Sequence, residues 1–322
     1  MNVSQLEWLI TLGVTGAVLL FDVIYVGRRP HEPTTRECVL YLSAYIGLAI
    51  GFGIWVWNFH GGQFGLEFYA GWLTEYSLSV DNLFIFLIIM TSFKVPKVYQ
   101  QQALLVGIVL ALIFRGIFIA LGAVAINQFS WIFYVFGAFL VYTAIRLLRD
   151  TDHSDDADNS VLRFARRYLS TTDTWAGLKL YIKDGGKRLM TPMFLVILAL
   201  GTTDLLFALD SIPAIYGLTK EPYLVFTANL FALMGLRQLY FLLGDLLKRL
   251  AYLSQGLAFI LFFIGVKLVL HALHENTLPF INGGEHVAVP EIPTLLSLAV
   301  IVLTLFLTMV ASLVKTRVIE KG

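Results

Sequence analysis

The chain has 322 residues, of which 58% are hydrophobic and only 14% are charged, and its formal net charge is +1 at pH 7. A soluble protein of this length needs more polar surface, so the composition indicates an integral membrane protein whose partner is the lipid bilayer. The near-neutral charge excludes an extended electrostatic interface with nucleic acid. The single cysteine, Cys38, excludes a disulfide within the chain.

Runs of about 20 apolar residues, the length that crosses a bilayer, recur along the whole sequence. We expect nine membrane-spanning helices, at 5–26, 37–57, 68–91, 102–125, 129–148, 192–217, 222–245, 254–273 and 294–314. The N-terminus lacks the basic segment of a signal peptide, so we expect none to be cleaved. The sequence therefore predicts an all-α, polytopic transmembrane bundle in which residues 1–322 form one transporter domain.

The basic residues are distributed unevenly between the two sides of these spans. Most of the 23 Lys and Arg fall in alternate connections, at 27–36, 94–97, 146–191, 248–249 and 315–321. The opposite connections contain only Lys220. The positive-inside rule then places the N-terminus outside and the C-terminus in the cytoplasm. We therefore expect a multi-pass protein of the cell's inner (plasma) membrane.

Two connections are long enough to have a role of their own. The cytoplasmic loop 149–191 opens with the acidic cluster DTDHSDDADNS (150–160). This cluster lacks the glycine and the closing glutamate of an EF-hand calcium loop, so we interpret it as a solvated linker. The following residues, 161–190, are a candidate for a short helix on the membrane surface.

The outer loop 271–293 is rich in histidine and glutamate. Its members are His271, His274, Glu275, Glu285, His286 and Glu291. A metal-collecting site at the exit is one interpretation, and a solvated loop with incidental histidines is the favoured one.

Two acidic motifs lie inside apolar spans. They are EYSLSVDN (75–82) and DLLFALDS (204–211). In each motif two carboxylates are six residues apart, and a small polar side chain, Asn82 or Ser211, follows the second. A carboxylate in hydrocarbon costs roughly 2.5–3.5 kcal/mol even on lenient insertion scales. The same costly pattern in two places indicates a cation site built from two related halves.

The resemblance between the halves extends beyond the motifs. The span after each motif contains an arginine, Arg115 in IFRGIFI and Arg237 in LMGLRQLYF. Spans three to five and six to eight then look like two copies of one unit that enter the membrane from opposite sides. Inverted repeats that meet at polar sites near the midplane are typical of secondary transporters.

Helix geometry separates the two carboxylates within each motif. Six residues of regular helix turn through about 600°, so the paired acids point about 120° apart. Glu75 then shares a face with Ser79, whereas Asp81 faces elsewhere. Either the helix unwinds, as Pro213 would favour in the sixth span, or the two acids have different partners, one pairing with an arginine and one left for a ligand. The repeat predicts that Asp81 and Asp210 lie at one central cavity.

The charges within the spans do not cancel. The acids are Asp22, Glu75, Asp81, Asp204 and Asp210. The bases, which we expect to support the site, are Arg115, Arg237 and Lys267. If all are ionised, two negative charges remain, which one divalent cation or protonation would balance. Interhelical ion pairs that only lock the bundle are the alternative, although a net excess of acid is a poor design for a lock.

The chemistry of these side chains favours a hard ion. Carboxylate, amide and hydroxyl oxygens suit Mg²⁺, Ca²⁺ or Mn²⁺. No histidine or cysteine lies in the middle of a span, which argues against zinc or copper as the preferred ion.

The motifs LSVDN (78–82) and DLLFALDSIPA (204–214) resemble the signature of the TerC family of integral membrane proteins, in the branch that includes bacterial Alx-type proteins. The similarity continues through IFYVFGAFLVYTA (132–144), TPMFLVI (191–197), TANLFALMGLRQLYFLL (227–243) and FIGVKL (263–268). The resemblance implies export of manganese from the cytoplasm, a role tied to tellurium resistance and the alkaline-pH response.

The resemblance also implies a set of metal ligands, with Asp22 as a supporting acid. On this chain the ligands are Glu75, Asp81, Asn82, Asp204, Asp210 and Ser211. Related proteins often have a glutamate three residues before the first aspartate of the second motif, where this chain has Gly201. The chain therefore offers one carboxylate fewer than such relatives.

The sequence thus predicts a secondary transporter that exports manganese(II) as its substrate and has no resident cofactor. It contains no G-x-x-x-x-G-K-[ST] nucleotide loop, so an ion gradient or the metal gradient must supply the energy. Proton antiport is attractive because buried carboxylates can exchange a metal for protons. The alternatives are export of another divalent cation such as calcium, or of a cationic amino acid, and a scaffold that delivers metal. An enzyme is not expected, because the chain lacks both facing intramembrane histidines for haem and a GxGD protease motif.

Overall fold

The computed structural model describes residues 1, 3–28, 33–129, 131–149, 172, 175, 179–184, 187–243, 252–276, 278 and 281–319. These residues are almost wholly helical, as the sequence predicts. The helices are α1 (Gln5–Arg28), α2 (Thr35–His60), α3 (Gly62–Ser92), α4 (Lys97–Gln128), α5 (Ile132–Arg149), α7 (Pro192–Tyr216), α8 (Pro222–Met234), α9 (Leu236–Leu243), α10 (Leu253–His274) and α11 (Thr294–Ile319). A short 3-10 helix, η2 (Asn282–Gly284), lies between α10 and α11.

Each expected span coincides with helical structure. Within the described residues, eight helices are long and apolar enough to cross a membrane, with α8 and α9 counted together. The prediction of a predominantly helical bundle with many helices able to span a membrane is confirmed. The remaining expected span, at α1, and the orientation of the bundle stay predictions.

The span expected at 222–245 is present as one candidate span over Pro222–Leu242, and Gly235 divides it into α8 and α9. One expectation about local structure is wrong. The surface helix expected at 161–190 is replaced at its end by an antiparallel hairpin of β1 (Tyr181–Asp184) and β2 (Lys187–Met190). Two short runs separated by Gly-Gly are a hairpin signal, which the helical interpretation passed over. The acidic cluster at 150–160 lies outside the described residues.

The helix boundaries follow from local capping chemistry. Thr34 and Glu37 form a reciprocal capping box at the start of α2, in which each side chain accepts a hydrogen bond from the other's backbone. Gly61, with φ of 112°, turns the chain directly from α2 into α3. Such a backbone angle favours glycine because it has no Cβ. At the start of α7 the hydroxyl of Thr191 accepts from the backbone of Phe194.

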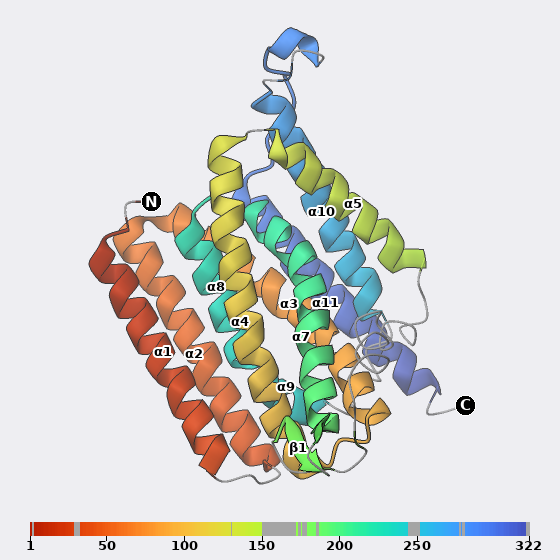
Figure 1. Ribbon diagram of the computed structural model, residues 1–322. Coiled ribbons are helices and arrows are strands. Elements are labelled where there is room, and N and C mark those ends of the chain that lie inside the picture. Colours follow the sequence, from red (N-terminus) through yellow and green to blue (C-terminus); the bar gives the residue numbers. More distant parts are fainter. Residues whose placement is uncertain are drawn as a thin grey trace.

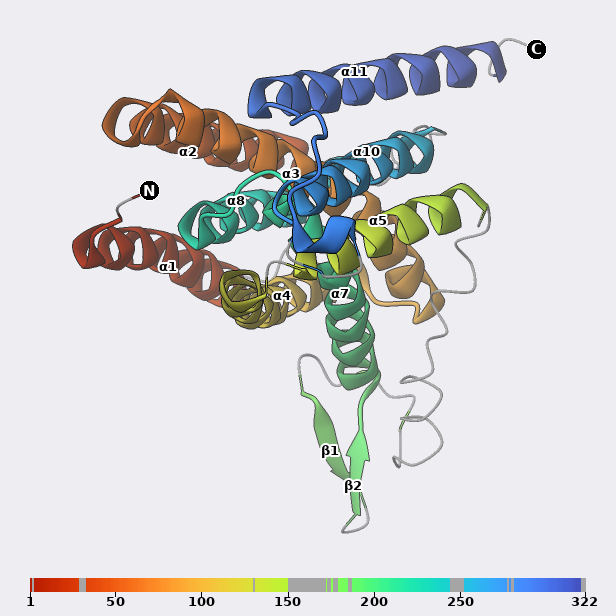
Figure 2. The same cartoon turned by 90° about the horizontal axis from the view of Figure 1, so that it is seen from above.

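Helix α3 occupies the centre of the bundle. It packs against α8, α7, α2, α11 and α10, and α4 packs along α7 (Figures 1 and 2). Figure 2 shows α11 and α2 on the outside of this arrangement and the β-hairpin projecting beyond α7. The two acidic motifs, on α3 and α7, therefore lie on adjacent helices in the interior.

The most extensive helix pair is α5 with α10, and facing glycines allow its close approach. A Cβ at Gly137 would lie 2.8 Å from the carbonyl oxygen of Gly265, and a Cβ at Gly265 would lie 2.9 Å from the carbonyl oxygen of Gly137. Small residues at such contacts let helix backbones pack tightly where lipid gives no hydrophobic driving force.

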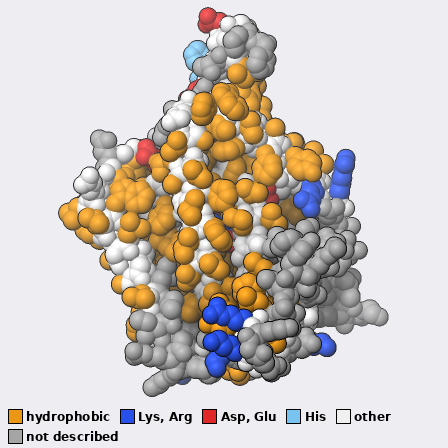
Figure 3. Space-filling view, viewed as in Figure 1, with side chains coloured by type: hydrophobic (Ala, Val, Ile, Leu, Met, Phe, Trp, Pro, Cys, Tyr) orange, Lys and Arg blue, Asp and Glu red, His pale blue; other side chains and the backbone are white. Residues whose placement is uncertain are grey.

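The outer surface of the bundle is apolar over a large area. Figure 3 shows hydrophobic side chains across the face in view, with Lys and Arg gathered at its lower end and right edge. On α11 alone, Leu295 is 62% exposed, Leu303 58% and Phe306 57%. Exposed apolar area on this scale marks a surface covered by lipid rather than by water.

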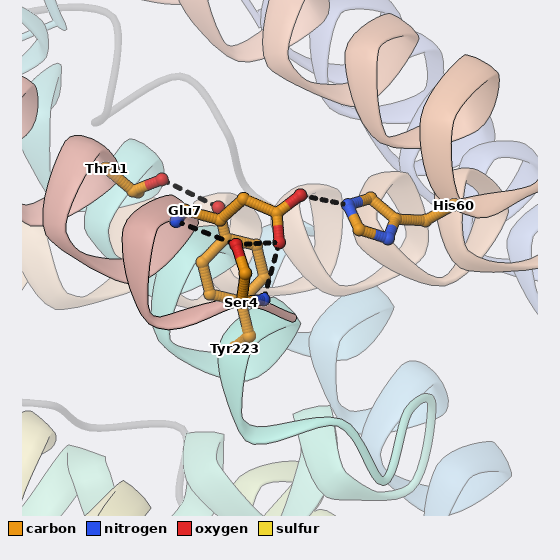
Figure 4. Close-up of polar contacts among 5 residues, drawn as sticks. All are labelled: Ser4, Glu7, Thr11, His60 and Tyr223. Carbon is orange, nitrogen blue, oxygen red and sulfur yellow. Dashed lines mark hydrogen bonds and ion pairs between the residues drawn. The ribbon is translucent and has the colours of Figure 1, made fainter. Parts of the chain in front are cut away.

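Polar contacts join α1 to the rest of the bundle near its first turn (Figure 4). The carboxylate of Glu7 accepts hydrogen bonds from the backbone and hydroxyl of Ser4 and lies 3.0 Å from the His60 ring at the end of α2. The hydroxyls of Thr11 and Tyr223 share a hydrogen bond of 2.6 Å, which links α1 to α8. These contacts hold one end of α1 against its neighbours.

The glycine contact predicts a stability difference between two Gly→Ala variants. Gly137→Ala places a Cβ against backbone atoms of α10, and overpacking of this kind costs about 1–3 kcal/mol. Gly51→Ala on α2 meets nothing within 4 Å and should be neutral or stabilising by up to about 1 kcal/mol. Thermal unfolding in detergent should show a lower Tm for Gly137→Ala only. Equal Tm values would contradict the close approach of α5 and α10.

Candidate functional site

One arginine gathers the first carboxylate of both acidic motifs. Arg115, in the middle of α4, is completely buried. Its Nε and Nη2 donate to the two carboxylate oxygens of Asp204 on α7, at 3.2 and 3.1 Å. Its Nη1 forms an ion pair with Glu75 on α3 and donates to the Ser211 hydroxyl at 3.3 Å. We call Glu75, Arg115, Asp204 and Ser211 the central cluster.

The central cluster is closed to solvent and its charges do not balance. Glu75 is 0% exposed and Asp204 2%. Two ionised carboxylates against one guanidinium leave one negative charge in excess. Uncompensated charge is costly in a low-dielectric interior. The central cluster can therefore accept one further positive charge.

Several buried oxygen atoms near the central cluster have no hydrogen-bond partner in the described part of the chain. They include the hydroxyls of Thr74 and Ser79, which flank Glu75 on α3. Asn229 on α8 is 1% exposed, and neither end of its amide is paired. Helix α8 packs along both α3 and α4. Buried polar groups without partners are rare, and hydroxyl and amide oxygens suit a hard cation.

The structure separates the members of the ligand set expected from the sequence. Glu75, Asp204 and Ser211 meet at Arg115. Asp210 instead accepts a hydrogen bond of 3.0 Å from Thr143 on α5 and is partly exposed.

The helix around Pro213 is continuous in α7, so the two acids of this motif have different partners and unwinding does not occur. The side chains of Asp22 and Asp81 lie outside the described residues. Whether Asp81 lies at one cavity with Asp210 therefore stays a prediction.

Asn82 is buried on α3. Gly201 faces Leu110 of α4, one turn before Asp204.

The other intramembrane bases lie away from the central cluster. Arg237 lines a small cavity together with Glu37 and Cys38 near the start of α2. Lys267 on α10 donates to the Ser297 hydroxyl of α11 at 3.1 Å. One arginine therefore serves the first acid of both motifs, where the sequence suggested one arginine for each.

A cavity of about 930 Å³ opens at the end of the bundle where α3 begins and α7 ends. Its lining includes Glu67, Tyr216 and Lys267 but none of the central cluster. Glu67 is 7% exposed and accepts hydrogen bonds from Thr219 at 2.6 Å and from Gln63 at 3.0 Å. Glu67 was not among the predicted site residues because the expected span begins at residue 68, although an acid in the apolar run FGLEFYAG is a signal of the same kind as the motifs.

The histidine-rich loop does not form a metal site in the described residues. No three His, Cys, Asp or Glu side chains gather there, or elsewhere among the described residues, closely enough to hold a metal ion. Glu275 pairs with Lys220 at 2.9 Å, and His274 lies 3.4 Å from Glu291. Burial raises the pKa of Glu275, but the hydrogen bond from Lys220 and the charges of His271, Lys220 and His274 together outweigh it and leave that pKa below its usual value. These contacts are ion pairs of an ordinary kind, and the role of the loop stays a prediction.

Comparison with known proteins identifies relatives over almost the whole chain. The family model described as "Integral membrane protein TerC family" matches residues 60–320. An uncharacterized membrane protein of Mycobacterium tuberculosis is 47% identical over 98% of this chain and 81% of its own length. One of Rickettsia bellii is 31% identical over 98% of this chain and 100% of its own. A Shigella flexneri protein named Alx and described as a membrane-bound redox modulator is 36% identical over 80% of this chain and 83% of its own. No solved structure matches the chain.

The central cluster predicts a strong energetic coupling between its members. Arg115→Gln leaves two buried carboxylates without a cation, and breaking such a pair costs about 3–5 kcal/mol. Adding Glu75→Gln and Asp204→Asn removes both orphaned charges and should recover most of this loss. Thermal unfolding in detergent at neutral pH measures each step. A triple variant as unstable as Arg115→Gln would show that the arginine acts through packing rather than charge.

Proposed function

The chain belongs to the TerC family of integral membrane proteins, and we propose that it exports a hard divalent cation, manganese(II), from the cytoplasm as a secondary transporter. The observation that carries the proposal is the central cluster, in which two buried carboxylates from different helices share one guanidinium. A cluster with excess negative charge attracts a cation, and the surrounding helices exclude water from it. The family resemblance supplies manganese as the ion, and the oxygen chemistry supports it.

The donor atoms favour manganese over softer metals. The central cluster offers carboxylate and hydroxyl oxygens, and the hydroxyl of Ser79, about one helical turn from Glu75, is buried without a hydrogen-bond partner in the described part of the chain. Hard cations such as Mn²⁺ and Ca²⁺ take oxygen ligands of these kinds, whereas zinc and copper prefer sites with nitrogen or sulfur. Calcium remains the alternative substrate because its ligand chemistry is the same.

The packing of the helices supports an inverted repeat. Exchanging α3 with α7, α4 with α8 and α5 with α10 converts the α3–α8 contact into the α7–α4 contact and returns the α5–α10 contact to itself. Gly71, early in α3, faces Ile215 at the end of α7, so these equivalent helices run in opposite directions. Glu75 and Asp204 then occupy equivalent positions on either side of Arg115, the arrangement expected for alternating access.

The large cavity supplies a route for the ion on one side. With the orientation given by the positive-inside rule, this cavity faces the outside and would be the exit. Tyr216 lies in its lining and follows Ser211 by five residues, about 7.5 Å along a helix. The Tyr216 hydroxyl donates to the carbonyl oxygen of Ile119 on α4 at 2.7 Å. We infer that this contact belongs to the outer gate and that Glu67 receives the ion beyond it.

A thiol mechanism has less support on this chain. The Shigella relative's name refers to redox modulation, but a dithiol couple within one chain needs two cysteines. This chain has one, Cys38, which is 2% exposed.

Removing either acid of the central cluster should abolish manganese export. Glu75→Gln and Asp204→Asn each remove a carboxylate that the ion would bind, so cells expressing either variant should lose the manganese tolerance conferred by the wild type. Glu285→Gln, which changes an exposed loop carboxylate, is the matched control and should keep it. Membrane levels are measured by immunoblot. Wild-type tolerance in either cluster variant at normal expression would refute the assignment.

Proton coupling, if present, should appear as a dependence on the pH gradient. Ionised carboxylates bind metal better than protonated ones, so protons moving inward should drive metal outward. In proteoliposomes, Mn²⁺ movement should follow an imposed pH gradient in the opposite direction, and collapsing the gradient should slow it. Mn²⁺ flux that follows only its own gradient would support a uniporter and remove the antiport component.

A further inference from the structure

Arg115 occupies the position that a metal ion would need. Both carboxylate oxygens of Asp204 already accept hydrogen bonds from its guanidinium, and the same guanidinium pairs with Glu75. A cation that binds these two carboxylates together must displace at least part of Arg115. The described residues also provide no third acidic side chain to hold the ion beside it.

The charge balance makes the two cations exclusive. With the carboxylates ionised and Arg115 in place, the central cluster carries one negative charge, and a divalent ion added beside the arginine would leave one positive charge. With the ion in place of the arginine, the carboxylates are neutralised. With neither cation, two negative charges stay buried together, which is the most costly arrangement.

We propose that Arg115 is a tethered competing cation: it bridges Glu75 and Asp204 when the transporter is empty, withdraws when the metal binds, and returns when the metal leaves. The proposal rests on the proposed function and adds how the empty site is stabilised. In net transport a secondary transporter must return without its metal before it can carry another ion. Arg115 lowers the cost of that return because it keeps the carboxylates from being buried without a counter-charge.

The structure offers acceptors for the withdrawn guanidinium. Arg115 already donates to Ser211, which is not a charged partner. Its neighbour Gly116 faces Phe226 of α8, and Asn229 follows Phe226 by three residues, so its amide lies on the same side of α8. The amide oxygen of Asn229 is buried without a hydrogen-bond partner in the described part of the chain. A shift of the side chain toward α8 would satisfy both groups.

Measuring net efflux and exchange separately distinguishes a competing-cation role of Arg115 from a purely structural one. In proteoliposomes, net Mn²⁺ efflux into metal-free buffer requires the empty transporter to return. Exchange of radioactive Mn²⁺ against equal unlabelled Mn²⁺ on both sides does not. Arg115→Gln should retain exchange at or above the wild-type rate and lose net efflux at least tenfold. Arg237→Gln removes another buried arginine and is the matched control, in which net efflux and exchange should change by the same factor.

Arg115→Lys keeps the proposal testable if Arg115→Gln does not fold. Lysine retains the charge but not the two-pronged contact with Asp204, so it competes less with the metal. This variant should reach half-maximal exchange at a several-fold lower Mn²⁺ concentration than the wild type and show slower net efflux. Folding is checked by size-exclusion chromatography before reconstitution.

The outcomes are distinguishable. A folded Arg115→Gln protein that loses both modes equally, or keeps both, would overturn the competition, as would unchanged Mn²⁺ affinity in Arg115→Lys. A wild-type protein with no Mn²⁺ flux in either mode would overturn the proposed function itself, and the competition would fall with it.

Discussion

The ion pairs of Arg115 are the interaction on which the centre of this bundle depends. A guanidinium inside a membrane protein must meet acids or carbonyl groups, because lipid and apolar side chains offer it nothing. Here it meets acids from two other helices, so α3, α4 and α7 are held in a single relative register. Each acid, in turn, is tolerable in the interior only because the arginine is there.

The rest of the architecture keeps water from this cluster. Close approach of α5 and α10 through Gly137 and Gly265 places a tightly packed pair beside the helices that carry the acids. The break at Gly235 divides the seventh expected span into α8 and α9. Close helix packing in a membrane depends on such small residues.

Local patterns in the sequence predicted the helices well, because length and hydropathy largely determine spans in a bilayer. They also identified Glu75, Asp204 and Ser211 as one site, since a repeated motif is visible without any structure. These patterns could not show which side chains pair with one another. That Arg115 serves both acids, while Asp210 bonds to Thr143, depends on which faces α4 and α5 present. Asn229 was missed because a single amide in an apolar helix leaves no periodic signal.

The number of carboxylates around each guanidinium distinguishes a candidate transport site from an ion pair that only holds two helices together. A pair of one carboxylate and one guanidinium is neutral, and its hydrogen bonds form only when the two groups are in contact. Such a pair therefore stabilises one fixed arrangement of the helices. Two carboxylates around one guanidinium keep affinity for another positive charge, while Arg115 prevents the empty site from becoming too costly to bury. Because equivalent acids come from helices running in opposite directions, each half of the bundle can offer its own carboxylate to its own side. In the transport function that we propose, the same excess charge that weakens the cluster as a structural element attracts the ion.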